Sequence, residues 1–188
     1  MSAIGNGLRV LRSSPFIQLQ DAGRFGVRHL GVTQSGALDW IAHRWANWLL
    51  GNPLTAAVVE ITLGNLEFEC TRDATLALTG ADLGARLDDQ TLLPWRSFNV
   101  RQGQRLSFAT PRQGARAYLA APGGFKAPLV LGSCASMRRE GLGGLHGEGV
   151  AFIDVLPRPP RPDLPAGTLW RERPRASWDS SKADVYRW

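Results

Sequence analysis

Two short runs of sequence, Val58-Val-Glu-Ile-Thr-Leu63 and Leu66-Glu-Phe-Glu-Cys70, decide the fold class of this chain. The first run is apolar and β-branched around Glu60, and the second alternates apolar and acidic residues. Such alternation is typical of a strand that buries one face and exposes the other. We therefore predict two β-strands here, with Cys70 as a small core residue.

Short strand-like runs separated by turn residues continue on both sides of this pair. About nine short strands with a single helix predict a mainly β protein, built as a β-barrel or a closed, twisted sheet. The further predicted strands are residues 8–11, 15–19, 76–78, 85–87, 91–93, 98–100, 106–109 and 115–121.

One α-helix is predicted over about residues 38–50. Ser35 is the expected N-cap, Asp39 lies early in the helix where its charge suits the dipole, and Gly51-Asn52-Pro53 ends the helix. His43 lies off the apolar face and is expected to be solvated. The predicted apolar face consists of Leu38, Ile41, Ala42, Trp45 and Leu49.

The pattern of the chain predicts one folded domain over residues 8–156. Residues 1–7 are expected to be disordered, and they lack the basic and apolar regions of a signal peptide, so a cytoplasmic location is expected. Residues 157–174 contain six prolines, which is typical of a linker. We therefore interpret residues 157–188 as a proline-rich linker followed by a truncated tail.

Charge and composition exclude several classes of function. The net charge of the 188 residues is +6, but residues 157–188 hold half of it and the other arginines are scattered. Nucleic-acid binding needs a coherent basic patch, so no nucleic-acid partner is expected. No apolar run is long enough for a membrane span. The two cysteines and three histidines are too far apart in sequence to predict a metal site or a disulfide framework.

The polar residues of the Gly-rich segments form a recognisable set. Its motifs are Gln20-Asp-x-Gly-Arg-x-Gly26, Gly31-Val-x-x-Ser-Gly-Ala-Leu-Asp39, Glu60-Ile-Thr-Leu-Gly64, Leu78-Thr-Gly-Ala-Asp82 and Tyr118-Leu-Ala-Ala-x-Gly-Gly124. In order and spacing, from Leu8 to Gly144, the chain resembles the carboxyltransferase-domain family. That family includes allophanate hydrolase subunit 2, KipA and the C-type component of bacterial ATP-dependent 5-oxoprolinase.

The resemblance implies a cyclophilin-like β-barrel, of which this chain would form the N-terminal half. It implies a C-type subunit that works with a B-type subunit (KipI- or allophanate hydrolase subunit 1-like) and an A-type subunit on a small amide or lactam. The reaction is then the opening of 5-oxoproline to glutamate, with ATP consumed by the assembled system. A biotin-dependent carboxyltransferase and a non-catalytic KipA-like binding module, or an inactive truncated fragment, are the alternatives. No residue pattern here indicates where ATP would bind.

Both reactions develop negative charge on an oxygen and therefore need fixed hydrogen-bond donors. As acid–base groups the sequence offers Asp21, Asp39 and Asp82, and Arg24 is a candidate partner for a substrate carboxylate. Each residue also has a purely structural explanation. Asp39 would only interact with the helix dipole, Asp82 would only stabilise a turn, and Arg24 would form an ion pair with Asp21. The expected substrate-binding residues are Gln20, Arg24, Ser35, Gly36, Glu60, Gly80, Gly123, Gly124 and Ser133.

Two departures from the family pattern stand out. Family members are longer than this chain, and they usually carry Arg and Thr near the positions of Cys134 and Ser136. An arginine there would form a carboxylate-binding fork, which a cysteine does not replace. The chain alone is therefore expected to be inactive.

Overall fold

The computed structural model describes residues 7–14, 16–144 and 152–154, all within the unit Met1–Arg158. The predicted linker and tail, residues 157–188, and the first six residues lie outside the described part. A six-stranded antiparallel sheet has the order β11 (Phe152–Asp154), β1 (Gly7–Arg12), β4 (Leu66–Cys70), β9 (Arg105–Phe108), β6 (Arg86–Leu87), β7 (Gln90–Thr91). A five-stranded antiparallel sheet has the order β2 (Ile17–Gln20), β3 (Val58–Thr62), β10 (Gln113–Ala120), β5 (Ala74–Asp82), β8 (Arg96–Val100).

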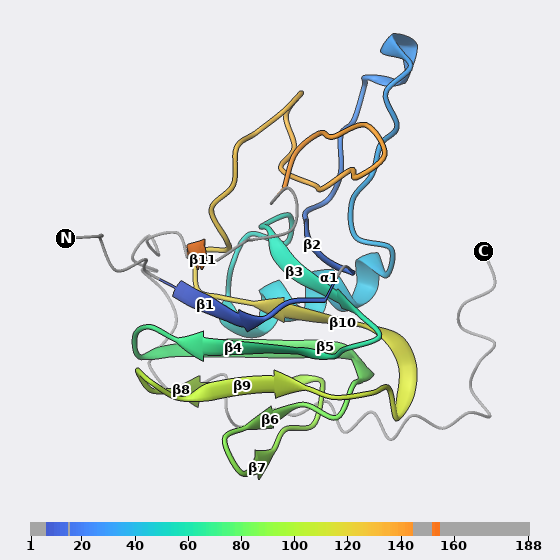
Figure 1. Cartoon of the computed structure of the whole chain (residues 1–188). Helices are drawn as coiled ribbons and strands as arrows, with labels where there is room; N and C mark the ends of the chain where they lie inside the picture. Colours follow the sequence, from blue (N-terminus) through green and yellow to red (C-terminus); the bar gives the residue numbers. More distant parts are fainter. Residues whose placement is uncertain (1–6, 15, 145–151, 155–188) are drawn as a thin grey trace, which may run out of the picture. The chain divides into compact units, whose positions relative to one another are not determined.

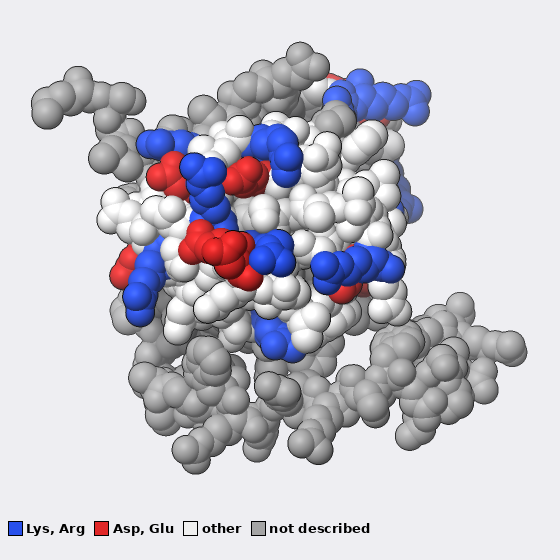
Figure 2. Space-filling model, turned by 60° about the horizontal axis from the view of Figure 1, so that its bottom comes forward, with Lys and Arg blue, Asp and Glu red and all other residues white. Residues whose placement is uncertain are grey.

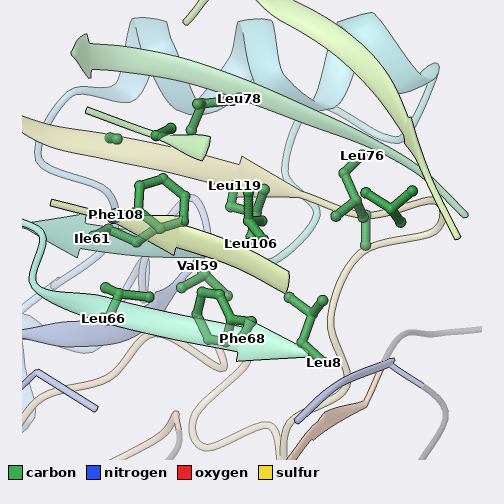
Figure 3. Close-up of a cluster of buried hydrophobic side chains, with 14 of the residues drawn as sticks. Leu8, Val59, Ile61, Leu66, Phe68, Leu76, Leu78, Leu106, Phe108 and Leu119 are labelled. Atoms are coloured by element: carbon green, nitrogen blue, oxygen red, sulfur yellow. The ribbon is translucent and has the colours of Figure 1, made fainter. Parts of the chain in front are cut away.

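One core joins the two sheets, because alternate residues of each point toward the other. Phe68 of β4 and Phe108 of β9 meet edge to face, with ring centroids 6.4 Å apart. Val59 and Ile61 of β3 belong to the same apolar cluster, as Figure 3 shows. Cys70 is buried in the same cluster, as predicted.

The prediction of a mainly β fold with one helix is confirmed (Figure 1). Within the described residues the strands form two separate hydrogen-bonded sheets rather than one closed barrel. The strands predicted over residues 85–87 and 91–93 form a hairpin, in which Leu87 pairs with Gln90 across a turn at Asp88-Asp89. β5 is longer than the predicted strand over residues 76–78 and includes Gly80.

A correction concerns where helix α1 (Trp40–Leu50) begins. Its N-cap is Asp39 and not Ser35. Asp39 Oδ1 accepts hydrogen bonds from the amides of Ile41 at 3.1 Å and Ala42 at 2.9 Å. Ser35 lies in the preceding loop, beyond the short 3₁₀ helix η1 (Arg28–Leu30). Gly51 ends α1 with a left-handed conformation, φ 66°, as its position predicted.

The buried face of α1 also differs from the prediction. Leu38 and Trp45, expected inside, are 67% and 36% exposed. The helix rests on the five-stranded sheet through Ala42 and Ala46, because small side chains let it approach closely. The buried residues of α1 are Ala42, His43, Ala46, Asn47 and Leu50.

His43 is buried, contrary to the prediction, because its ring has a fixed partner. Nε2 lies 2.9 Å from the carbonyl oxygen of Ala56, so this nitrogen donates. The side-chain amide of Asn47 donates to the same oxygen at 2.9 Å. Two polar side chains are thereby satisfied under the helix.

The outer face of the six-stranded sheet carries charges of both signs. Arg9 pairs with Glu69 at 3.0 Å, and Arg105 pairs with Glu67 at 3.4 Å. Such exposed pairs contribute about 0–1 kcal/mol each. In the view of Figure 2, basic and acidic side chains stand beside one another across the surface. Within the described ranges no helix is long and apolar enough to cross a membrane.

We predict that His43 makes the fold sensitive to mild acid. Burial lowers the pKa of His43 below its ordinary value, against the opposing effect of the Ala56 carbonyl. As pH falls through about 6.5, the unfolded chain takes up a proton that the folded chain binds less readily, so the free energy of unfolding falls. His43→Gln should remove this part of the pH dependence between pH 7 and 5. The control is His29→Gln at an exposed position, and the free energy of unfolding is measured by chemical denaturation at each pH. The same dependence on pH for the native chain and both variants would contradict the prediction.

Candidate functional site

Two loops that are distant in sequence meet beside β2. The first comprises residues 20–37 and the second residues 130–144, and Figure 1 shows them, blue and orange, side by side above the sheets. The amide of Ser136 donates to the carbonyl of Leu19 at 2.8 Å. Within the first loop, the amide of Arg24 donates to Gln34 at 2.7 Å. The backbones approach so closely that a Cβ on Gly36 would lie 2.9 Å from the nitrogen of Gly23.

Asp21 joins the two loops through both carboxylate oxygens. Oδ1 accepts from the amide of Gly23 and from the hydroxyl of Ser133, each at 2.7 Å. Oδ2 accepts from the amide of Cys134 at 2.8 Å, and the Cys134 thiol lies 3.4 Å away. Burial and the charge of Asp21 raise the pKa of the Cys134 thiol to about 12. These contacts fix the loops and leave the carboxylate little freedom to act as a base.

Arg24 is an interior cation. It is 1% exposed, and it contacts the second loop through backbone carbonyls. Nε donates to Val130 at 3.0 Å, and Nη2 donates to Ala135 at 2.6 Å and to Ser133 at 3.5 Å. Nη1 has no hydrogen-bond partner among the described residues. The ion pair between Arg24 and Asp21 that the sequence left open is not formed within 4.0 Å.

Three further predicted residues belong to the same loop cluster. The side-chain amide of Gln20 donates to the carbonyl of Ser136 at 3.2 Å, and its buried Oε1 has no partner within the described part of the chain. The Ser35 hydroxyl donates to the same Ser136 carbonyl at 3.0 Å. Ser133 is fully buried on Asp21. The structure thus brings together Gln20, Asp21, Arg24, Ser35, Gly36 and Ser133.

A second polar cluster lies where α1 begins. Glu60 Oε2 accepts from the Tyr118 hydroxyl at 2.9 Å and from the amide of Leu38 at 3.1 Å. The Tyr118 oxygen in turn accepts from the amide of Asp39 at 2.8 Å. Arg116 Nε lies 3.4 Å from Glu60 Oε1. Burial, and next the charge of Glu60, raise the pKa of Tyr118, so its hydroxyl stays protonated and donates.

Sequence reasoning missed Tyr118 as part of this cluster. Tyr118 lies in an apolar run of β10, and from this position alone the sequence predicts a core residue. Strand register shows its role: Tyr118 pairs with Glu60 of β3 on one side and with Thr79 of β5 on the other. A polar residue opposite a polar residue on neighbouring strands is the signal that would have found it, once the pairing was known.

The remaining predicted residues occupy separate places. Asp39 is the helix N-cap, and Asp82 Oδ1 accepts from the amide of Gly84 at 2.9 Å in a turn. The amide of Gly123 donates to Asn52 at 2.8 Å, so it is already paired. Gly124 N likewise donates to Ala121. Catalytic roles for the three aspartates stay predictions, and the structure does not gather them into one group.

Gly80 is needed for close packing between strands. Its φ is +84°, and a Cβ there would lie 2.6 Å from the carbonyl oxygen of Arg116. The same Cβ would lie 3.2 Å from Tyr118 Cδ2. Gly80 therefore lies within strand β5, where it allows β5 to approach β10 closely beside the second polar cluster, and it does not form an open loop.

In the described part of the chain, the amides around the start of α1 are already paired and do not suit the phosphates of ATP. A helix N-terminus binds phosphate through free amides. At the start of α1, however, the amides of Leu38, Asp39, Ile41 and Ala42 already donate to Glu60, Tyr118 and Asp39. Nor does any group of three His, Cys, Asp or Glu side chains in this part of the chain suit a metal ion.

Comparison with known proteins identifies the family. Residues 30–187 match the family described as carboxyltransferase domain, subdomain A and B, a range that includes most of the predicted linker and tail. The chain is 43% identical to the C-type 5-oxoprolinase subunit of Escherichia coli over 150 residues, which are 80% of this chain and 48% of that protein. It is 37% identical to the C-type 5-oxoprolinase subunit of Haemophilus influenzae, over 73% of this chain and 45% of that protein.

A solved structure agrees with these sequence relatives. The urea amidolyase of K. lactis matches with a TM-score of 0.75 at 28% identity, covering 82% of this chain and 9% of that one. The chain belongs to the carboxyltransferase-domain family, as its loop motifs indicated. It spans about half the length of the curated 5-oxoprolinase subunits that it matches.

We predict that Asp21 contributes more to stability than any exposed carboxylate. Asp21→Asn keeps the shape but points an amide group at donors that need an acceptor, and it should lower the free energy of unfolding by about 2–3 kcal/mol. The exposed Asp89, changed to Asn, is the matched control and should change stability by less than about 0.5 kcal/mol. Equal effects of the two variants in urea denaturation would contradict this role.

Proposed function

We propose that this chain is part of a C-type subunit of an ATP-dependent 5-oxoprolinase, which acts in the cytoplasm with B-type and A-type subunits. The assembled enzyme would open the lactam of 5-oxoproline to give glutamate. Support comes from the two 5-oxoprolinase subunits at 43% and 37% identity. The observation in the structure that carries the proposal is the buried Arg24, which has no ion-pair partner among the described residues.

A buried guanidinium without a counter-charge calls for an anion. Burying an unpaired charge is costly, and a carboxylate matches the planar fork of arginine. Nη1 of Arg24 has a free donor, and Oε1 of Gln20 is a free acceptor, within the described part of the chain. Both side chains contact residues 133–136. In the proposed complex Arg24 binds the substrate carboxylate, and Gln20 accepts from the lactam N–H.

The other site residues hold these two in place. Asp21 and Ser133 fix the loop whose carbonyls orient the Arg24 guanidinium, and Ser35 fixes Ser136. Glu60 and Tyr118 anchor the loop that carries Ser35 to the start of α1. Asp21, Asp39 and Asp82 are the proposed acid–base groups, and the cap bonds of Asp39 use only Oδ1. ATP is proposed to be bound elsewhere in the complex.

Two alternative functions from the same family would use the same residues. In a biotin-dependent carboxyltransferase, Arg24 would bind the carboxylate being transferred. In a non-catalytic KipA-like module, binding of a companion subunit would be the whole function. The exposed face of α1 supports a binding role, because it carries Trp40 and Trp48, which are 58% and 46% exposed. Exposed tryptophans grouped on one helix are typical of protein interfaces.

We predict that Arg24→Lys impairs substrate binding in the assembled system. Lysine keeps the charge but loses the fork, so the KM for 5-oxoproline in 5-oxoproline-dependent ATP hydrolysis should rise about 10- to 100-fold. Arg101→Lys, at an exposed position, is the control. An unchanged KM in a folded Arg24→Lys variant would rule out the assigned carboxylate site. Stabilisation of the native chain by 5-oxoproline in thermal unfolding, absent in Arg24→Lys, is the independent measurement.

We predict that the tryptophan face of α1 binds the B-type subunit. Trp48 packs edge to face on Trp45 at 5.0 Å, and Arg44 lies over Trp40 at 4.9 Å, so both exposed tryptophans contact a neighbouring side chain of the helix. Trp40→Ala combined with Trp48→Ala should weaken binding at least about 10-fold in calorimetry, without changing the unfolding temperature by more than a few degrees. The control is Trp95→Ala, which removes an exposed tryptophan from a loop. If the native chain, the double variant and Trp95→Ala bind the B-type subunit with equal affinity, the interface lies elsewhere.

A further inference from the structure

Residues 130–144, here called the strap, cover the guanidinium of Arg24. Val130, Ser133 and Ala135 of the strap accept all the side-chain hydrogen bonds that Arg24 donates within the described part of the chain. Arg24 is 1% exposed, although its Nη1 has no partner there. While the strap is in place, a solute has no route to this charge.

The strap is attached mainly by hydrogen bonds. The amide of Leu19 donates to Ser136 Oγ at 3.2 Å, and Gln20 and Ser35 donate to the Ser136 carbonyl. Of the strap residues, only Cys134 belongs to the main core cluster, and Ala135 and Met137 are the other buried apolar residues of the strap. A neutral hydrogen bond contributes less to stability than a large buried apolar side chain, and the strap's strongest bonds are those of Ser133 and Cys134 to the charged Asp21. Segments with few apolar contacts open locally at a lower free energy than the fold as a whole.

Both ends of the strap have backbone conformations suited to hinges. Leu131 and Gly132 have φ of +52° and +79°, and Gly141 and Gly143 have φ of +63° and +64°. A non-glycine residue at positive φ is strained, and glycine rotates with little steric cost. Hinges of protein segments are a few residues of this kind that absorb the change in backbone angles.

We propose that the strap opens as a unit, while both sheets stay folded, and that this opening exposes Arg24 to an anionic solute. In the closed state the guanidinium donates to three carbonyls and is buried, and in the open state an anion gains access to its unpaired Nη1. The inference rests on the proposed function only for the identity of the anion, a carboxylate.

The two cysteines of the chain report on this opening. Cys134 lies in the strap, and Cys70 lies in β4, between β1 and β9. Burial raises the pKa of Cys134 to about 12 and that of Cys70 to about 11, so neither thiol reacts in the closed state. Alkylation with N-ethylmaleimide, followed by peptide mass spectrometry of the intact chain, should modify Cys134 at least about 100-fold faster than Cys70. Equal rates would overturn the proposal, because both thiols would then become accessible by global unfolding.

A strap variant separates local opening from a general loss of stability. Ser136→Ala removes the bond from the Leu19 amide and should speed the modification of Cys134 about 2- to 10-fold. The rate at Cys70 should stay constant, and Ser97→Ala in β8 should change neither rate. If Ser136→Ala accelerates both cysteines equally, the strap does not open independently.

Added 5-oxoproline, compared with sodium acetate and with sodium chloride at equal ionic strength, tests the anion. A carboxylate that binds the open state should raise the Cys134 rate severalfold, since a ligand favours the state to which it binds. If Cys134 reacts much faster than Cys70 but 5-oxoproline and acetate change nothing, the opening stands and the carboxylate assignment of Arg24 fails. If chloride acts equally, the site takes any small anion, and the assignment to a carboxylate is also wrong.

Discussion

The carboxylate of Asp21 holds together two segments that lie 113 residues apart in the sequence, and the site depends on this contact. Asp21 receives the amides of Gly23 and Cys134 and the hydroxyl of Ser133. With the loops fixed in this way, the carbonyls of the second loop point at Arg24. A charged acceptor with several donors is among the stronger buried interactions, and removing it leaves each donor unpaired.

The loop of residues 33–39 links the two polar clusters of the molecule. At one end Ser35 contacts Ser136, and at the other the amides of Leu38 and Asp39 contact Glu60 and Tyr118. The same segment supplies the N-cap of α1. The helix that carries the exposed tryptophans is therefore joined to the Arg24 loops by a short stretch of backbone that is hydrogen-bonded at both ends.

The fold class could be predicted from the sequence because the apolar, β-branched run of β3 and the alternation along β4 are local patterns. The buried face of α1 could not be predicted, because the small Ala42 and Ala46 are buried in place of the larger Trp45 only where a sheet lies close to the helix. His43 looked like a surface residue because its partner, the Ala56 carbonyl, is supplied by a loop. At the site, residue types were sufficient to propose Arg24 and Asp21, but their separate hydrogen-bond partners depend on the meeting of distant loops.

The row formed by Gln18, Glu60, Tyr118 and Thr79 runs across four neighbouring strands of the five-stranded sheet. A slip of one residue in β3 would turn Glu60 toward the apolar core and bring Val59 or Ile61 out to the helix side. Neither arrangement is tolerable, because an unpaired carboxylate would then lie among the core leucines and phenylalanines. The carboxylate that anchors the start of α1 thus also selects one strand alignment among several that hydrophobicity alone would allow.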